Sequence, residues 1–410
     1  MIHTYEADDI LALGVKWREA MHRADEADAL NEGRHYGSRP NRQAQEPVLL
    51  EELQFEMSRV SRKSLVLTNY DATSCHDRIV PSVAMLASRK FGVPKSVTLA
   101  NANTLKNAQY RILTDMGLAP SEYSHTPEHP IYGTGQDSGA NGPSLWLFLD
   151  SVVLYHCYDS KTASAVYCTP DKRNRISLGM AGFVDDFNGQ TNQFEKDWSK
   201  RTWQLILQAA QKNAQLWTNL LHASGGALEL AKCSFHLLRW SFSISGAPVL
   251  TVPDNIPDLV ARNPQTLVQH GLPMLSPYSA HKTLGHYKEP NGSQVEQAKQ
   301  LQILCADQEV SFLWKSPLNR TEAWYFYSAC FLVPSVTYPL ANSHFSKALL
   351  QQTQHTAMSI IVAKCGFNRH TKREVLYGST HLGGAEFSES LYDKQGIGQV
   401  PAFLCHWRTG

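Results

Sequence analysis

Three aspartates in this sequence stand where carboxylates can do chemistry. Asp185 and Asp186 are adjacent in the segment GMAGFVDDFNG, which is otherwise apolar and rich in glycine. Asp71 directly follows a second apolar run, LVLTNY. Two like charges a few ångströms apart repel each other unless a cation lies beside them, and Mg²⁺ prefers such hard carboxylate oxygens. The pattern predicts a divalent metal site, although an isolated Asp-Asp pair is more often a surface turn.

The elements that position these aspartates follow from the surrounding pattern. Residues 65–70 are typical of a buried strand, and residues 81–92 of a helix that begins at a proline and ends at a glycine. A second strand-like run ends at the Asp185–Asp186 pair, and the polar residues after it indicate a hairpin with both aspartates at its bend. We therefore expect Asp71 to converge with this pair at one end of a small sheet.

A glycine-rich stretch, YGTGQDSGANGPSLWLFL, lies between the two acidic segments. It fails the dinucleotide-binding pattern G-x-G-x-x-G, because Ser138 replaces the third glycine and no strand immediately precedes it. A glycine-rich loop before an apolar helix still lets the backbone approach a flat ligand such as a base pair. Gln136 is then free to contact a nucleotide.

Together these segments resemble the reverse transcriptases of retroelements, nearest to the group related to LINE-type retrotransposons and group II introns. YDATSCHDRI is similar to the first catalytic block, GTGQDSGANGPSLW to the block G-x-x-Q-G-x-x-x-S-P, and GFVDD to the block [YF]-x-D-D. Lys232 precedes a strand as in a later palm block, HKTLGHY resembles the Leu-Gly segment before the thumb, and HYGSRPNR resembles the fingers segment G-F-R-x-G-R. These six blocks follow the family's order over roughly residues 30 to 290.

The resemblance implies an α+β chain with a right-hand polymerase fold and the activity of an RNA-directed DNA polymerase, a nucleotidyltransferase. It implies partial fingers in residues 1–64, a palm with a small antiparallel sheet in 65–250, a Pro-rich linker or insertion in 251–282, and a helical thumb and C-terminal region in 283–410. An RNA template, a DNA primer and deoxynucleoside triphosphates are the implied partners. No endonuclease block is visible, so strand cutting would need a separate protein.

The same resemblance assigns roles to individual residues. The catalytic set would be Asp71, Asp185, Asp186 and Lys232. The three aspartates would bind two Mg²⁺ ions, with Mn²⁺ as a substitute, and the lysine would act on the leaving pyrophosphate. The nucleotide pocket would be lined by His76, Gly135 and Gln136. Template phosphates would be contacted by Arg39 and Arg42, for which a solvated loop is the open alternative.

Three departures from the family pattern keep other interpretations open. His76 stands where the family usually has Tyr or Phe, Asp137 replaces a glycine, and the chain begins inside the segment that resembles the fingers. The alternatives are a truncated, catalytically decayed retroelement fragment and an exapted RNA-binding protein with the same fold. A metal-dependent nuclease that uses the same aspartates would need a His or Lys general base nearby.

The composition says more about the expected cellular compartment than about the function. Lys and Arg number 38 against 37 Asp and Glu, so any nucleic-acid site must be a local basic patch. The eight cysteines include no C-x-x-C pair, which argues against a zinc module or a secreted disulfide fold. An intracellular setting is expected, without a choice between nucleus and cytoplasm. The acidic start MIHTYEADD and the short apolar runs predict neither a signal peptide nor a membrane span.

Overall fold

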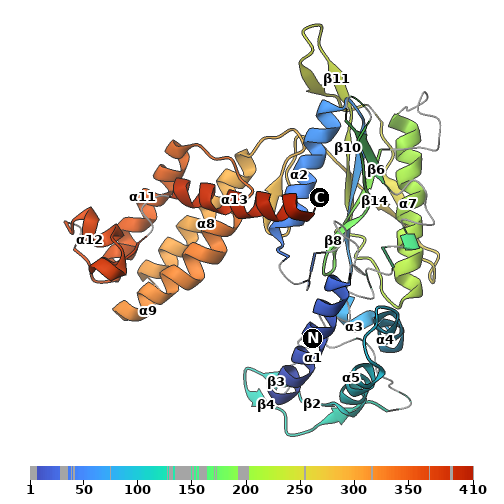
Figure 1. Cartoon of the computed structure of the whole chain (residues 1–410), viewed down its shortest axis with the longest axis horizontal. Coiled ribbons are helices and arrows are strands. Elements are labelled where there is room, and N and C mark those ends of the chain that lie inside the picture. Colours follow the sequence, from blue (N-terminus) through green and yellow to red (C-terminus); the bar gives the residue numbers. More distant parts are fainter. Residues whose placement is uncertain are drawn as a thin grey trace. The chain divides into compact units, whose positions relative to one another are not determined.

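The computed structural model of the chain contains two compact units (Figure 1). The first comprises Met1–Pro47 and Glu56–Pro277, and the second comprises Val48–Phe55 and Tyr278–Gly410. The described residues of the expected active site all belong to the first unit. The structure describes residues 7–27, 36–37, 39, 42–73, 75–126, 128, 133, 149, 152–153, 155–156, 164–169, 171, 173–192, 203–253, 255–314, 317–368, 370–387 and 391–409.

A five-stranded sheet forms the centre of the first unit, in the order β15-β10-β1-β9-β8. Neighbouring strands are antiparallel, except that β10 and β15 run parallel. The hairpin expected before and after the Asp185–Asp186 pair is present as β8 and β9. The strands are β1 (Leu65–Asp71), β8 (Ala181–Phe183), β9 (Asp186–Thr191), β10 (Ser234–Leu238) and β15 (Met274–Leu275).

The centre of this sheet is fixed by aromatic packing. Residues 65–70 of β1 are all buried, as their mostly apolar sequence predicts. Helix α7 (Trp203–Ala223) packs against β1 and β9 (Figure 1). Its fully buried Trp217 has its ring centroid 6.3 Å from that of Tyr70 and 5.0 Å from that of Phe187. Because large aromatic rings bury much apolar area, this cluster holds β1 against β9 just before the expected catalytic residues.

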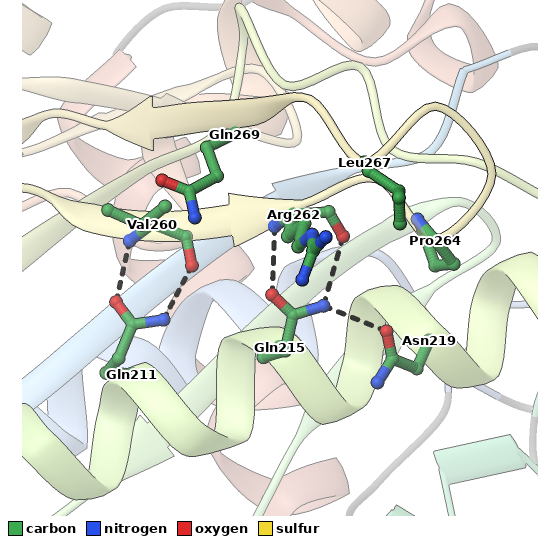
Figure 2. Close-up of a pocket in the computed structure, with 8 residues that line it drawn as sticks. All are labelled: Gln211, Gln215, Asn219, Val260, Arg262, Pro264, Leu267 and Gln269. Carbon is green, nitrogen blue, oxygen red and sulfur yellow. Dashed lines mark hydrogen bonds between the residues drawn. The ribbon is translucent and has the colours of Figure 1, made fainter.

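Two glutamines of α7 bind one edge of β13 (Leu259–Arg262) as a neighbouring strand would (Figure 2). The Gln211 amide donates to the Val260 oxygen at 2.5 Å and accepts from the Val260 nitrogen at 2.6 Å. Gln215 makes the same two bonds with Arg262, at 3.0 and 2.8 Å. The backbone groups on this edge are therefore satisfied without a further strand.

The segment 251–282, expected to be a Pro-rich linker or insertion, contributes strands to the first unit. It holds β13, β14 (Gln269–Leu272) and β15, and β13 pairs with β14. Proline density marks where turns lie and does not prevent strands between them, because a proline outside a ladder removes no ladder hydrogen bond. The prolines between these strands and beside them are Pro253, Pro257, Pro264, Pro273 and Pro277.

Helices and short hairpins complete the first unit. The expected helix at Pro81 is present, and Gly92 follows it with φ 88°. The helices are α1 (Ala7–Glu26), α3 (Cys75–Arg78), α4 (Pro81–Lys90) and α5 (Lys95–Asn107). The paired strands are β2 (Gln109–Tyr110) with β5 (Tyr123–Ser124), β3 (Leu113–Thr114) with β4 (Gly117–Leu118), β6 (Ala165–Cys168) with β7 (Arg175–Leu178), and β11 (Trp240–Phe242) with β12 (Pro248–Leu250).

The second unit is mainly helical, as expected for the C-terminal third. Its one described hairpin pairs β16 (His281–Thr283) with β17 (His286–Lys288). Buried Lys288 of this hairpin forms an ion pair with Glu52 on the middle part of α2 (Gln45–Val60). The remaining elements are α8 (Val295–Trp314), α9 (Arg320–Tyr325), the π-helix η2 (Phe326–Thr337), α10 (Tyr338–Leu340), α11 (Lys347–Lys364), α12 (Arg373–Tyr377), η3 (Thr380–Leu382) and α13 (Leu391–Thr409).

Small, mostly antiparallel sheets in the first unit and helices in the second confirm the expected α+β fold class. Within the part of the chain that the structure describes, none of the helices combines the length and the apolar character needed to cross a lipid bilayer.

Candidate active site

Asp71 and Asp186 lie opposite each other at one end of the central sheet. Asp71 is the last residue of β1, Asp186 is the first residue of β9, and the two are partners in the antiparallel ladder. Directly opposed residues in such a ladder have Cα atoms about 4.5–5.5 Å apart and side chains on the same face. The preceding pair, Tyr70 with Phe187, points to the other face, toward α7. The structure therefore brings these two carboxylates together on a face that the aromatic cluster does not occupy.

Asp185 lies on the two-residue turn between β8 and β9, next to Val184. Val184 has φ 59°, a conformation that β-branched residues rarely adopt and that costs roughly 1–2 kcal/mol. Gly37 lies directly against this turn, because a Cβ added to it would be 2.7 Å from the Val184 nitrogen and 2.8 Å from Val184 Cγ2. The Tyr36 nitrogen donates to the oxygen of Gly182 at 2.9 Å. Residues 36–37 thus support the strained turn that carries Asp185.

The carboxylates influence one another electrostatically. The pKa of Asp186 is raised to about 6, mainly because surrounding protein atoms exclude water from the carboxylate, although part of the side chain remains exposed. The negative charges of Asp185 and Asp71 raise this pKa further, and Lys232 lowers it. Lys232 Nζ lies 3.5 Å from Asp71 Oδ2. A cation bound beside Asp186 would favour the ionised form of its carboxylate.

Helix α3 carries His76 and begins at a residue close enough to Asp185 to sense its charge. The helix begins four residues after Asp71, at the buried residue Cys75. Burial and the charge of Asp185 together raise the pKa of the Cys75 thiol to about 12. His76 is the next residue and is half-buried. The expectation that His76 lies under the sugar of an incoming nucleotide stays a prediction.

One residue of the glycine-rich stretch contacts α3. Gly133 has φ 80°, and a Cβ added to it would lie 2.6 Å from the oxygen of His76 and 2.7 Å from the Cα of Asp77. Gly133 therefore packs closely on the backbone of α3, where a side chain would not fit. Gly135 and Gln136, which we expect to line the nucleotide pocket, lie outside the described residues.

Arg39 and Arg42, expected to contact template phosphates, are buried and ion-paired instead. Arg39 Nε donates to Asp25 Oδ1 at 2.7 Å, and only 3% of the arginine side chain is exposed. Arg42 Nη1 donates to Glu46 Oε2 at 3.0 Å, with 8% of its side chain exposed. A buried, paired guanidinium is not available to neutralise a phosphate of the template. The geometry supports a structural role for both arginines.

The donor atoms at this end of the sheet suit a Mg²⁺ ion that keeps water and substrate ligands, rather than a metal ion enclosed by protein ligands alone. Among the residues that the structure describes, no group of three or more His, Cys, Asp or Glu side chains is arranged to hold a metal ion. Asp71 and Asp186 nevertheless present hard carboxylate oxygens from facing positions. Mg²⁺ usually takes only one or two carboxylates from a protein and completes its shell with water and substrate phosphate. The site therefore suits an ion that is bound together with a phosphate-bearing substrate.

Two concave surfaces of the first unit are lined by none of the aspartates of the candidate site. One, beside α7 and β13, has a volume of about 630 Å³ (Figure 2). The other, formed by α4, α5 and the β2–β5 pair, has a volume of about 920 Å³. Neither is lined by a carboxylate.

Sequence reasoning missed several residues that shape the site. They are Tyr36 and Gly37, which support the acidic turn, and Thr73 and Glu229, whose side chains bond to each other at 2.9 Å beside Asp71. Glu229 stands three residues before Lys232, and Thr73 two residues after Asp71. Their closeness in sequence to Asp71 and Lys232 could have marked them as candidates. The bond between them could not be predicted, because the two residues are 156 positions apart in the chain.

No protein-family model matches this chain, and no curated protein matches it. Three solved telomerase structures are similar to it. Telomerase from Candida albicans in complex with the TWJ fragment of telomeric RNA is 11% identical over 98% of this chain and 54% of that chain, with a TM-score of 0.43. The corresponding complex from Candida tropicalis is 11% identical over 99% of this chain and 54% of that chain, with a TM-score of 0.39.

The third is the apo telomerase from Candida tropicalis, which is 10% identical over 98% of this chain and 56% of that chain, with a TM-score of 0.41. This chain spans about half the length of each of these telomerase chains.

Proposed function

We propose that this chain is an RNA-directed DNA polymerase, which extends a DNA primer on an RNA template. The observation that carries the proposal is the pairing of Asp71 with Asp186 at the end of the central sheet, with Lys232 Nζ 3.5 Å from Asp71. Six sequence blocks in the order of the reverse transcriptases support the same reaction. Phosphoryl transfer relies on position and charge rather than on covalent chemistry, so fixed carboxylates beside a cation are the parts that it needs.

Asp71, Asp185 and Asp186 are the residues that would hold Mg²⁺. Two such ions, or Mn²⁺ in their place, supply a lowered pKa for the primer 3′-hydroxyl and charge stabilisation for the leaving pyrophosphate. The protein's own part is to hold the carboxylates at a fixed spacing, which the β1–β9 ladder does for two of them. Lys232 orients Asp71 and provides a positive charge, and a proton, for the pyrophosphate.

The nucleotide pocket in this proposal is formed by α3 and the glycine-rich stretch that begins at Gly133. His76 contacts the sugar, and Gly135 and Gln136 contact the nucleotide. The substrates are deoxynucleoside triphosphates and an RNA template paired with a DNA primer. The proposal extends to a retrotransposon-type enzyme that leaves strand cutting to a separate endonuclease.

Extension of a DNA primer annealed to RNA, with Mg²⁺ and all deoxynucleoside triphosphates, tests the proposal. We expect elongation by the wild type, none after chelation of Mg²⁺, and none by Asp71→Asn. Elongation by Asp71→Asn at the wild-type rate would contradict the mechanism. Tight, metal-independent RNA binding without elongation would support the non-catalytic RNA-binding alternative.

A further inference from the structure

The residues that follow β1 pair with a segment outside the named strands. The Glu229 nitrogen donates to the Asp71 oxygen at 2.9 Å, and the Thr73 nitrogen donates to the Ala227 oxygen at 2.9 Å. A β-bridge joins residues 72 and 228 between these two bonds. The backbone from Asp71 to Thr73 is therefore held by residues 227–229, which precede β10 in the chain.

A bulge separates this short pairing from the β1–β10 ladder. From the last β1–β10 pair to the bridge of Ala72 with Leu228, the β1 side advances three residues while the partner side recedes six. The three additional residues form a turn, in which the Lys232 nitrogen donates to the Glu229 oxygen at 2.8 Å. Bulges redirect side chains, and this one brings Lys232 Nζ to 3.5 Å from Asp71 Oδ2.

One side-chain hydrogen bond closes the arrangement. Thr73 Oγ1 donates to Glu229 Oε2 at 2.9 Å in a partly buried position. Glu229 thus bonds to Asp71 with its nitrogen, to Lys232 with its oxygen, and to Thr73 with its carboxylate. Its side chain is engaged with a neighbour, so it acts through that neighbour rather than on the substrate.

We propose that Glu229 is a positioning residue of the active site. Through Thr73 and the bulge, it fixes the carboxylate of Asp71 relative to the ammonium of Lys232. The effect of Glu229 on catalysis rests on the proposed function. Its effect on metal binding rests only on Asp71 being a metal ligand and not on polymerase activity, because the same bonds set where the Asp71 carboxylate can meet an ion.

Four variants of the full chain separate this role from general stability. Glu229→Gln keeps an oxygen that accepts from Thr73, whereas Glu229→Ala and Thr73→Val each remove the bond. Glu122→Ala is the matched control, since Glu122 is an exposed acid that pairs with Arg111 on a surface hairpin. Thermal unfolding shows which variants stay folded. Mn²⁺ binding without nucleotide and single-turnover addition of one deoxynucleotide are then measured, the second giving kpol and the nucleotide Kd.

We expect Glu229→Ala and Thr73→Val each to lower kpol about tenfold and to weaken Mn²⁺ binding about threefold or more, with little change in the nucleotide Kd. Glu229→Gln and Glu122→Ala should stay within about twofold of the wild type, because neither removes the bond. The double variant of Glu229→Ala with Thr73→Val should resemble each single variant, since both remove one interaction.

Wild-type kpol and Mn²⁺ affinity in a folded Glu229→Ala would overturn the inference. A Glu229→Gln variant as impaired as Glu229→Ala would also overturn it, because the bond to Thr73 would then not be what matters. If Glu229→Ala does not fold, Thr73→Val decides in the same way. If the wild type adds no nucleotide but Mn²⁺ binding follows the expected order, the proposed function fails and the inference stands.

Discussion

Asp71 faces Asp186 across the β1–β9 ladder, whereas Asp185 lies on the turn just outside that ladder. Strand pairing therefore places two of the three aspartates on the backbone, and a strained turn supported by Gly37 places the third. A slip of the register by a single residue would move Asp186 to the other face of the sheet. The geometry of the site thus depends on the same contacts that determine the register, above all the packing of Trp217 on β1 and β9.

Asp186→Asn should stabilise the metal-free protein while it abolishes synthesis. The pKa of Asp186 is raised to about 6, so the folded protein keeps this proton to higher pH than the unfolded chain does. Stability from this group is therefore full at low pH and is lost as pH rises through about 6. Chemical denaturation without Mg²⁺ should show a gain of about 1–2 kcal/mol for Asp186→Asn at about pH 8, less than the whole shift because solvent screens the group, and no gain at about pH 3.5.

The control for this measurement is Asp115→Asn, an exposed turn residue between β3 and β4. It should leave the unfolding free energy unchanged at both pH values. Destabilisation by Asp186→Asn at the higher pH would show that the folded protein does not disfavour the ionised form of the Asp186 carboxylate.

Gly37→Ala should disturb the acidic turn. The added Cβ would lie 2.7 Å from the Val184 nitrogen, a separation that forces the backbone to move. We expect a loss of about 1–3 kcal/mol in unfolding free energy and a lower elongation rate, because Asp185 moves with the turn. Gly396→Ala is the control, since a Cβ there meets nothing within 4 Å and alanine favours the helix α13. Equal behaviour of the two variants would rule out the support that Gly37 gives to the turn.

Arg39→Ala should lower stability without changing the salt dependence of RNA binding. The Arg39 guanidinium is buried beside Asp25, whose carboxylate is 31% exposed, so its removal costs the ion pair and the packing of the arginine and should lower stability by about 1–2 kcal/mol. Each protein cation that neutralises a phosphate adds to the slope of log affinity against log salt. Fluorescence anisotropy with an RNA–DNA hybrid measures that slope. If a folded Arg39→Ala shows a slope reduced by about one, Arg39 contacts a template phosphate, as the sequence predicts, and the purely structural role is wrong.

His76→Tyr should improve the choice of deoxynucleotides over ribonucleotides. His76 lies on α3, which begins four residues after Asp71. If it lies under the incoming sugar, as the proposed function holds, a larger aromatic ring would exclude a 2′-hydroxyl by contact, whereas imidazole can hydrogen-bond to it. A tenfold change in the ratio corresponds to about 1.4 kcal/mol and is the size we expect. Single-nucleotide addition with matched deoxynucleoside and ribonucleoside triphosphates measures the ratio. An unchanged ratio in an active tyrosine variant would show that His76 is not the gate.

The parts of the site that could be predicted from the sequence are those set by local pattern. The apolar run before Asp71 predicts a buried strand, and the run before Asp185 predicts a hairpin, and both are present. Their convergence follows from the way antiparallel strands share an end. Local pattern alone does not place Lys232 beside Asp71. That expectation came only from the family resemblance, because the position depends on a bulge whose size is set by pairing between residues 72 and 228.

Tertiary contacts that a local sequence pattern does not report decide the roles of Arg39 and Arg42 and the structure of the proline-rich segment 251–282. Arg39 and Arg42 lie in a basic loop that looks solvated, yet acids on α1 and α2 bury and pair them. Such partners are chosen by tertiary contacts that no local pattern reports. The prolines of 251–282 likewise indicate turns correctly, but whether the intervening residues form strands depends on the partners available to them, such as Gln211 and Gln215 for β13.

The most direct test of the central claim is the rate at which the chain adds one deoxynucleotide to a DNA primer paired with RNA in the presence of Mg²⁺. Wild type, Asp186→Asn and the control Asp115→Asn are compared at equal folded concentration. We predict templated addition by the wild type and by Asp115→Asn, and a loss of about a hundredfold to a thousandfold in Asp186→Asn, the scale of removing one central electrostatic element. Addition by Asp186→Asn at the wild-type rate, or none by a folded wild type, would contradict the account.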